Sequence, residues 1–514
     1  MKRSLLTIAL LTSLVLSQTQ GIAQRYLNYV FPSASVTADS AYASNIQVLT
    51  GTPTAVTLRM DVYEPAGAFD PLTERPLIIY LHTGSFLPAV INQTPTGSRK
   101  DSSVVEMCKR FARRGFVAAA ISYRVGWNPA SIDQDVRTGT LLQAVYRSIQ
   151  DVKACVRFFR KDADINGNTY GVDTNNIILV GQGSGGYVAL AYATLDDPAE
   201  IQLPKFLSTT NNATYGFNIG FPYVNQAVLG DYEGYGGVSS LNNPNNSVGY
   251  SSEINFVCNM GGAIGDSSWL QAGDAPMVAF HVVGDPFAPY GNGPVIVPTT
   301  GDFVVNVSGS QSVITQANAY GNNNCFANNT FTDPYTTYAN SVNGGQEGLF
   351  PFYTTPNAQA GPWEWFDSTS VVAVAQAYGF PQSQGTQIYQ NALLTNPNMS
   401  KAKALAYIDT VQEYLVPRIV FCRGLVGIEE NSAITASLQL MPNPAKDMVT
   451  ITLTDAAHSI LGVELVNVIG ETVYRQQGFV KQQIQLNRMQ LAAGIYLVKI
   501  TTDAGIATRK LIFE

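Results

Sequence analysis

Residues 176–190 form the segment of this chain whose residue types and spacing are most typical of catalysis. They read Asn-Ile-Ile-Leu-Val-Gly-Gln-Gly-Ser-Gly-Gly-Tyr-Val-Ala-Leu, an apolar strand followed by small residues and the start of an apolar helix. A sharp turn between a strand and a helix can display a nucleophile for acyl transfer, provided that the residues two before and two after it are small. Gly181 and Gly185 meet this requirement. The residue between them is Gly183, which offers no nucleophile.

Ser184 is the alternative nucleophile, but a turn centred on it places the bulky Gln182 where a small residue is needed. Serine chemistry also requires an imidazole that takes the hydroxyl proton and a carboxylate that orients the imidazole. The chain has three histidines, His82, His281 and His458. None of them can serve as this base without a rearranged site. We therefore expect two of the three catalytic groups to be missing.

Alternating strands and helices must position this turn. Apolar, β-branched runs predict strands, and apolar residues spaced three or four apart predict helices. The sequence predicts strands at 57–65, 75–81, 116–124, 177–180, 254–262 and 276–281, and helices at 102–114, 141–161 and 401–416. This alternation is typical of an α/β fold, a mostly parallel sheet with helices on both faces.

The remaining segments predict two insertions and a second domain. Polar stretches rich in Asn and Gly at about 205–250 and 291–345 are expected to be insertions in a body that spans residues 24–428. A polar linker is expected at 429–437. The following short alternating strands predict a small all-β sandwich over residues 438–514.

Residues 1–23 have the features of a secretory signal peptide, with a basic start, a short apolar core and small residues before a cleavage expected after Ala23. No later segment is apolar enough to span a membrane.

The net charge of −7 and the lack of a basic run exclude nucleic acid as an expected partner. Because the chain has five cysteines, at least one thiol has no intramolecular partner, and the pairing stays open.

The motifs of the body resemble those of the esterase/lipase group of the α/β-hydrolase family. The segments that carry the resemblance follow the family's order and lie at 82–86, 123–127, 181–186 and 281–290. The first is similar to the HGG-type loop whose backbone N–H groups stabilise an oxyanion. That similarity assigns this loop to His82, Thr83, Gly84 and Ser85.

The same resemblance implies where the other catalytic groups of the family would be. Asp285, in the segment that resembles the family's "HGTADPVVPYG", corresponds to the triad acid. The histidine should follow it near a Gly-rich turn, and the fitting stretch at 344–350 has Glu347 or Gln346 at that place. We therefore expect a vestigial site that consists of Gly183, Ser184, Asp285 and Glu347. For Asp285 a role in structuring its loop is the alternative to catalysis.

The last 77 residues resemble the type A sorting domain of type IX secretion. The resemblance is carried by Met-Pro-Asn-Pro-Ala at 441–445, an alternating strand closed by a Gly turn at 463–471, Leu-x-x-Gly-x-Tyr-x-x-Lys at 491–499 and the basic–apolar end at 509–514. It implies export across the outer membrane of a Gram-negative bacterium by the type IX machinery. Removal of the domain, with release or attachment to the outer cell surface, is expected to follow.

A pattern typical of a calcium loop starts at Asp162. Asp162, Asp164, Asn166 and Asp173 occupy the first, third, fifth and twelfth positions of such a loop, and Gly167 occupies the sixth. The alternative is a polar connection between a helix and a strand. We expect no other cofactor.

These observations together predict an exported, non-catalytic protein on an esterase scaffold, with a binding or assembly role. Its expected partners are the secretion machinery and, at the surface, a second copy of the chain, a glycan or a peptide. One alternative is an active carboxylesterase that uses Ser184 or a rearranged site. Another is a structural surface polymer. The sequence defines neither the ligand nor the oligomeric state.

Overall fold

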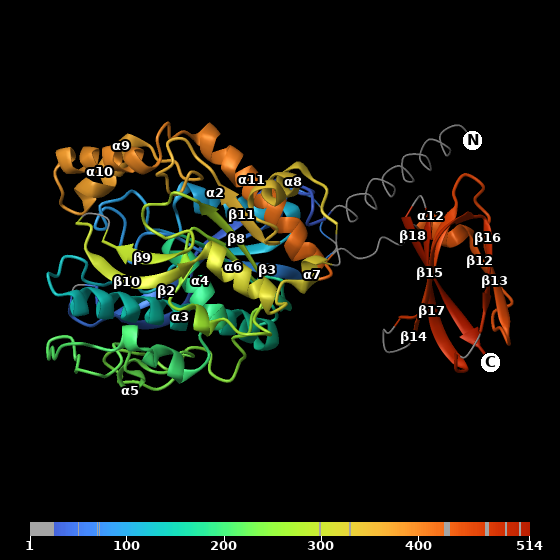
Figure 1. Cartoon of the computed structure of the whole chain (residues 1–514), viewed down its shortest axis with the longest axis horizontal. Coiled ribbons are helices and arrows are strands. Elements are labelled where there is room, and N and C mark those ends of the chain that lie inside the picture. Colours follow the sequence, from blue (N-terminus) through green and yellow to red (C-terminus); the bar gives the residue numbers. More distant parts are fainter. Residues whose placement is uncertain are drawn as a thin grey trace. The chain divides into compact units, whose positions relative to one another are not determined.

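The computed structural model describes residues 25–49, 51–68, 70, 72–297, 300–327, 330–425, 432–467, 472–488, 491–502 and 505–514. The expected signal peptide, the first part of the expected linker and the end of the 463–471 motif lie outside the described residues. The chain divides into one compact unit over Gln24–Arg423 and another that contains Gly424–Glu514 (Figure 1). No helix in the described ranges is long and apolar enough to cross a membrane.

The first unit is built on a sheet of eight described strands in the order β1-β2-β4-β3-β5-β6-β8-β11. The six strands from β4 to β11 run parallel, whereas β1 and β2 are antiparallel to their neighbours. This confirms the predicted mostly parallel sheet. The strands are β1 (Ser33–Gln47), β2 (Thr54–Ala66), β3 (Arg75–Leu81), β4 (Val117–Ile121), β5 (Val172–Gln182), β6 (Phe256–Met260), β8 (Met277–Val282) and β11 (Leu349–Phe352).

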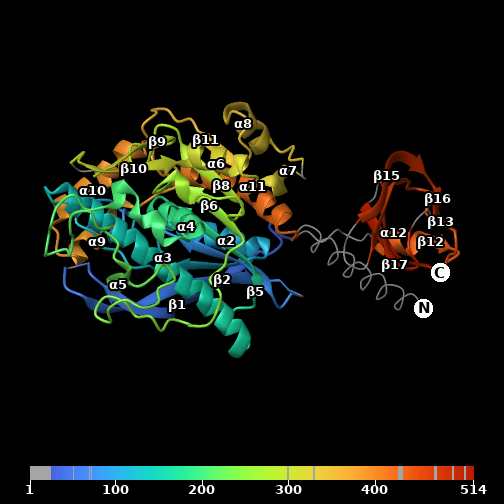
Figure 2. The ribbon, with the colours of Figure 1, turned by 60° about the horizontal axis from the view of Figure 1, so that its bottom comes forward.

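Helices cover both faces of this sheet. Helices α2 (Ser102–Arg114) and α11 (Lys401–Cys422) pack together on one face, and α3 (Gln134–Ile165) and α4 (Ser184–Thr194) on the other (Figures 1 and 2). Residues 177–180 of β5 are fully buried between the layers. This explains their unbroken apolar run, since strands covered on both faces do not alternate.

Two helices are longer than the sequence predicts. Helix α3 begins at Gln134 because the Asp133 side chain accepts a hydrogen bond from the backbone N–H of Asp135 and so caps the first turn. Helix α11 continues past Pro417 to Cys422, which forms a disulfide with Cys325. The other three cysteines are buried free thiols.

The two predicted insertions differ in structure. Residues 205–250, all of which are described, contain short helical turns and isolated β-bridges. The second segment includes α6 (Ser310–Ala319), whose Val313 and Ile314 lie in the hydrophobic core. Parallel strands such as β8 and β11 need a long crossover, usually a helix, so α6 belongs to the body and the prediction of one polar insertion over 291–345 is corrected.

Smaller elements complete the first unit. They are η1 (Pro198–Gln202), η2 (Pro204–Phe206), α5 (Gln226–Leu229), β7 (Ala263–Ile264), η3 (Ser267–Trp269), β9 (Asn292–Ile296), β10 (Phe303–Gly309), α7 (Asn324–Ala327), α8 (Pro334–Val342), α9 (Ser368–Ala377) and α10 (Gln382–Thr395).

The second unit is the predicted all-β sandwich. Its described strands form a sheet β12-β13-β16 and a sheet β15-β14-β17-β18, with a core of alternating apolar residues between them. The elements are α12 (Ser432–Ser437), β12 (Leu438–Met441), β13 (Met448–Leu453), β14 (Ile460–Asn467), β15 (Thr472–Lys481), β16 (Gln483–Asn487), β17 (Gly494–Thr502) and β18 (Gly505–Phe513).

Candidate functional site at the carboxyl edge of the sheet

The parallel strands bring the residues of the expected vestigial catalytic site to one edge of the sheet, with one exception. Strands β3, β5, β6 and β8 end next to one another, because their register pairs Leu81 with Gly181, Gln182 with Met260 and Met260 with Phe280. The segments that follow these strands therefore meet at the carboxyl edge. This edge is where open α/β folds place their ligands.

Gly183 forms the turn between β5 and α4. Its φ of 54° and ψ of −117° lie in the left-handed half of backbone space, which suits glycine. A Cβ at Gly181 would lie 2.1 Å from the carbonyl oxygen of Gly185, and a Cβ at Gly185 would lie 2.3 Å from that of Leu81. Both flanking positions therefore require glycine, which supports a turn centred on position 183.

The space in front of Gly183 is filled by Thr83. A Cβ placed on Gly183 would lie 2.0 Å from Thr83 Oγ1 and 2.8 Å from Thr83 Cβ. These distances are far below van der Waals contact, so the threonine side chain occupies the volume of a side chain at position 183. The site therefore lacks both a nucleophile at position 183 and the space for one.

The loop that carries Thr83 is held by local hydrogen bonds. His82 is buried, its ring stacks on Tyr123 at 4.6 Å, and its Nδ1 donates to the carbonyl oxygen of Thr83 at 2.5 Å. Gly84 and Ser85 both have positive φ, and the Asn92 side chain donates to the Gly84 carbonyl oxygen at 2.9 Å. Burial lowers the pKa of His82 to about 4, so this imidazole is a weak base at neutral pH.

Ser184 is not arranged as a nucleophile. Its side chain is buried, and no hydrogen bond within the described residues joins its Oγ to a histidine. The nearby hydroxyl is that of Tyr123, and a hydrogen bond with Ser184 lowers the pKa of this tyrosine against the larger effect of burial. No imidazole therefore lies within hydrogen-bond reach of Ser184.

Asp285 follows β8, as the family resemblance implies, but it orients no histidine. Its Oδ1 accepts hydrogen bonds from the backbone N–H groups of Phe287 at 2.7 Å and Ala288 at 3.2 Å. Burial raises its pKa to about 7, and the two N–H groups act against this rise. The neighbouring His281 lies in the core, where its Nε2 donates to the Ala288 carbonyl and its Nδ1 contacts Ser310.

Glu347 is the exception, and its predicted place is wrong. It precedes β11, at the amino edge of the sheet, so the strand separates it from the carboxyl edge. Its Oε1 accepts hydrogen bonds from Arg418 Nε at 3.0 Å and Nη2 at 2.7 Å. Gln346 is likewise occupied, by Asn318. Neither residue can replace a histidine beside Gly183.

The segment after β11 instead brings Glu364 to the site. Its carboxylate accepts a hydrogen bond from the side chain of Gln182, the residue before the turn. Burial raises its pKa to about 8, and repulsion from Asp101 and Asp285 adds to the rise. Sequence reasoning missed this residue, because its place at the site follows from the position of β11 in the sheet.

The three acidic residues of the expected calcium loop do not form a group. Asp162 and Asp164 belong to the last turn of α3, where residues two apart point to different sides. Asp173 lies in β5 and accepts hydrogen bonds from Asn175 and Asn176. In the described ranges, no three acidic, His or Cys side chains are grouped to hold a metal ion. The calcium site stays a prediction that these contacts do not support.

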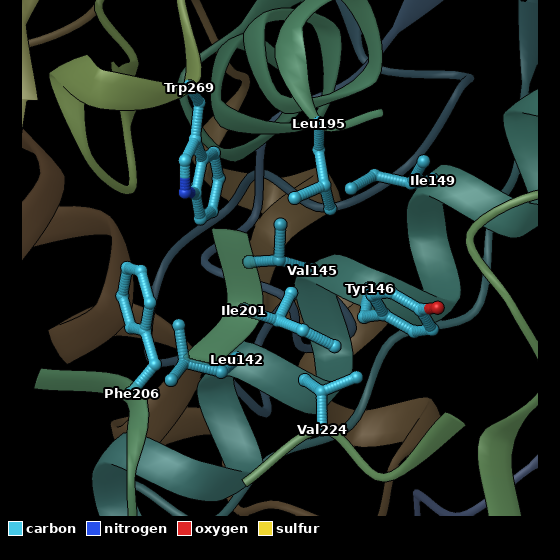
Figure 3. A pocket seen from close by; sticks show the side chains of 9 residues that line it. All are labelled: Leu142, Val145, Tyr146, Ile149, Leu195, Ile201, Phe206, Val224 and Trp269. Atoms are coloured by element: carbon cyan, nitrogen blue, oxygen red, sulfur yellow. The ribbon is translucent and has the colours of Figure 1, made fainter. Parts of the chain in front are cut away.

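An apolar pocket lies away from this edge, between α3 and the segments that follow α4 (Figure 3). It shares no residue with the turn at Gly183. Its lining consists of Leu142, Val145, Tyr146, Ile149, Leu195, Ile201, Phe206, Val224 and Trp269.

Comparison with protein families agrees with this geometry. A model for the BD-FAE family matches residues 60–221, and a model for the secretion system C-terminal sorting domain matches residues 439–514. The chain joins an esterase-like BD-FAE domain to a type IX sorting domain. The second match confirms the predicted sorting domain, and with it export through the type IX machinery to the cell surface or the medium.

Individual relatives are more distant. An endo-acting ulvan lyase of Formosa agariphila is 32% identical over 77 residues, which are 15% of this chain and 14% of that protein. Esterase 2 of Thermogutta terrifontis, phosphorylated by paraoxon, is 17% identical with a TM-score of 0.33, over 71% of this chain and 92% of that chain. The same esterase with bound propionate is 17% identical with a TM-score of 0.33, over 72% of this chain and 96% of that chain.

Proposed function

We propose that this exported protein does not hydrolyse esters and instead has a binding or assembly role at the cell surface or outside the cell. The observation that supports this most directly is the Thr83 side chain in the volume that a nucleophile at position 183 would need. Attack on an ester requires an activated hydroxyl, an oriented base and an oxyanion site that act as a unit. Here glycine stands where the hydroxyl would be, and no imidazole within the described residues is placed to act as the base.

One observation favours the rival, an esterase with a rearranged site. Thr83 itself has a hydroxyl near the N-terminal end of α4, where an attacking oxygen would lie. Its activation would need a base. The imidazole next to it, His82, is bonded to the Thr83 carbonyl and has a pKa of about 4. A base with this pKa argues against the rival.

Two measurements on the full chain test the proposal. Hydrolysis of p-nitrophenyl acetate should stay near the rate of the buffer. A fluorophosphonate probe, followed by peptide mass spectrometry, should leave both Ser184 and Thr83 unlabelled. Stoichiometric labelling of either residue, with ester turnover that the label abolishes, would establish the esterase and identify its nucleophile.

A further inference from the structure

A polar pocket lies at the opposite end of the strands from the turn at Gly183. It has a volume of about 630 Å³ and lies between α6, α7 and the turn that precedes β11 (Figure 1). Asn323, one of its lining residues, accepts a hydrogen bond from the backbone N–H of Met277, the first residue of β8, at 2.8 Å. The pocket is therefore at the amino edge of the sheet. Its volume is within the range of about 300–1,000 Å³ that is typical of small-molecule sites.

Hydrogen bonds fix the walls of this pocket. The Asn318 side-chain amide donates to Gln346 Oε1 at 3.0 Å and to the backbone carbonyl oxygen of Glu347 at 3.1 Å. Its own oxygen accepts a hydrogen bond from the Asn323 side chain at 2.8 Å. The disulfide described above also ties α7 to α11. These contacts hold the pocket in shape independently of any ligand, which lowers the entropy cost of binding.

Several hydrogen-bonding groups of the lining have no protein partner. Within the described residues, no hydrogen bond is made by Gln346 Nε2, by Glu347 Oε2 or by the side chains of Thr315 and Asn324. Thr315 and Asn324 are exposed, and Gln346 and Glu347 are half-buried. The pocket therefore offers a ligand amide and hydroxyl groups that both donate and accept hydrogen bonds, and a carboxylate oxygen that accepts them.

The charge of the lining is balanced. Glu347 is the one charged residue among the described residues that line the pocket, and its carboxylate pairs with Arg418 at 2.7 Å. An anion would find no cation in the lining, and a cation would compete with Arg418. The apolar side chains of the lining are those of Ala319 and Phe326, and Phe326 is 2% exposed. The pocket therefore suits a neutral, polar ligand.

We propose that this pocket binds a neutral sugar residue of a glycan. The inference rests on the proposed binding role and gives it a ligand class. A sugar presents several hydroxyl groups, each of which both donates and accepts hydrogen bonds. The amides of Asn324 and Gln346 pair with hydroxyls as donors and as acceptors, and the free oxygen of Glu347 accepts from them. A peptide would need apolar or charged subsites for its side chains, and this lining has few.

Calorimetric titration of the full chain tests this with neutral disaccharides. Cellobiose, maltose, lactose and xylobiose differ in linkage and ring substituents, and at least one should bind with a dissociation constant on the order of 1 mM or lower. Digalacturonic acid tests for an anion, and acetyl-alanyl-asparaginyl-alanine amide tests for a neutral peptide. Both should bind roughly tenfold more weakly than the best disaccharide. No binding by any of the four disaccharides, or tighter binding of the acid or the peptide, overturns the inference.

Hydrogen exchange followed by mass spectrometry locates the bound sugar. Peptides that cover residues 315–326 and 344–347 should exchange more slowly with the sugar present, because a ligand stabilises the folded segments that it contacts. Peptides that cover residues 181–186 should not change. Unchanged exchange at 315–326 and 344–347 contradicts the inference, and slower exchange at 181–186 instead would place the sugar at the carboxyl edge.

Variants test the individual groups of the pocket. Gln346→Glu keeps the oxygen that accepts from Asn318 but loses the Nε2 donors, and Asn324→Ala removes an exposed amide. Each should weaken sugar binding by roughly threefold to tenfold, as expected for the loss of one hydrogen bond. The matched control is Gln390→Glu, the same change at an exposed residue of α10, which should bind as the natural chain does. Equal affinity of Gln346→Glu and Gln390→Glu contradicts the inference.

The pocket shares no residue with the turn at Gly183, so the absence of ester hydrolysis and the binding of a sugar can be tested independently. Ester hydrolysis with intact sugar binding contradicts only the proposed function. An inert protein that binds no sugar contradicts only this inference.

Discussion

The hydroxyl oxygen of Thr83 lies 2.0 Å from the point where a Cβ atom on Gly183 would be. The two residues belong to different loops, after β3 and after β5, that meet at the carboxyl edge of the sheet. The HGG-type loop that this segment resembles has glycine where Thr83 stands. The threonine and the glycine therefore form a coupled pair, in which the side chain of one fills the space that the other leaves.

This coupling predicts that Gly183→Ser destabilises the first unit. The variant forces a side chain into the Thr83 volume and into a backbone conformation with φ of 54°. Strained backbone alone costs on the order of 1–3 kcal/mol. Urea unfolding followed by tryptophan fluorescence measures the change in this unit, because all four tryptophans of the chain lie in it, at positions 127, 269, 363 and 365.

The control for this prediction is the double variant Thr83→Gly, Gly183→Ser. Removal of the threonine side chain should restore part of the stability that Gly183→Ser loses, so the two changes should not be additive. If Gly183→Ser alone is as stable as the natural chain, the two positions are not coupled.

The disulfide Cys325–Cys422 predicts a second stability effect. It joins residues 97 apart in the sequence, and a cross-link over such a distance restricts the unfolded chain strongly. Replacement of both cysteines by serine should lower the free energy of unfolding of the first unit by about 2–4 kcal/mol. Non-reducing peptide mapping should find Cys108, Cys155 and Cys258 alkylated only after unfolding, and a disulfide that contains one of them would contradict the assignment.

The sorting domain predicts processing during export. The mature protein should be found in the medium or on the cell surface without residues 1–23 and without most of residues 438–514. Intact-mass measurement on both fractions checks this. A mature protein that still ends at Glu514 would show that the domain is not removed.

Much of the fold could be predicted because its signals are local. Gly181 and Gly185 define the turn through their own backbone neighbours, and the buried strand before them has an unbroken apolar run. Asp285 could be placed because it lies only three residues after the end of β8. Helix α6 could not be predicted, because its polar residues outnumber the apolar residues that reach the core.

The composition of the site could not be predicted, because it depends on loops that are distant in sequence. Nothing near Thr83 indicates that its side chain fills the space at position 183. Glu347 follows a Gly-rich turn as the family histidine does, yet it lies at the wrong end of β11 and pairs with Arg418. Glu364 lies at the site because of the order of the strands in the sheet. The residues around Glu364 do not indicate that order.

Glu364 predicts a pH dependence of stability. Its pKa in the folded protein is about 8, above the ordinary value of about 4.3, so between these values the folded protein keeps a proton that the unfolded chain has released. This contribution to stability therefore decreases as the pH rises from about 4.5 to 8. Glu364→Gln removes it and should gain stability relative to the natural chain by on the order of 1 kcal/mol for each pH unit between pH 5 and pH 8. Urea unfolding at both pH values measures this, and an equal difference at both would show that Glu364 is ionised in the folded protein.

The last prediction concerns the restoration of ester hydrolysis. Because catalytic residues act as a unit, Gly183→Ser alone should gain little activity. The variant Thr83→Gly, Gly183→Ser, Glu364→His frees the space, supplies a hydroxyl and places an imidazole at the residue that contacts Gln182, next to position 183. It should hydrolyse p-nitrophenyl acetate roughly a hundredfold faster than the same variant with Glu347→His in place of Glu364→His, since an oriented base contributes about 10²–10⁴ in rate. Addition of Asp285→Asn should remove most of the gain. If the Glu347→His version is the more active of the two, the base position lies at the other end of β11 and the assignment of Glu364 is wrong.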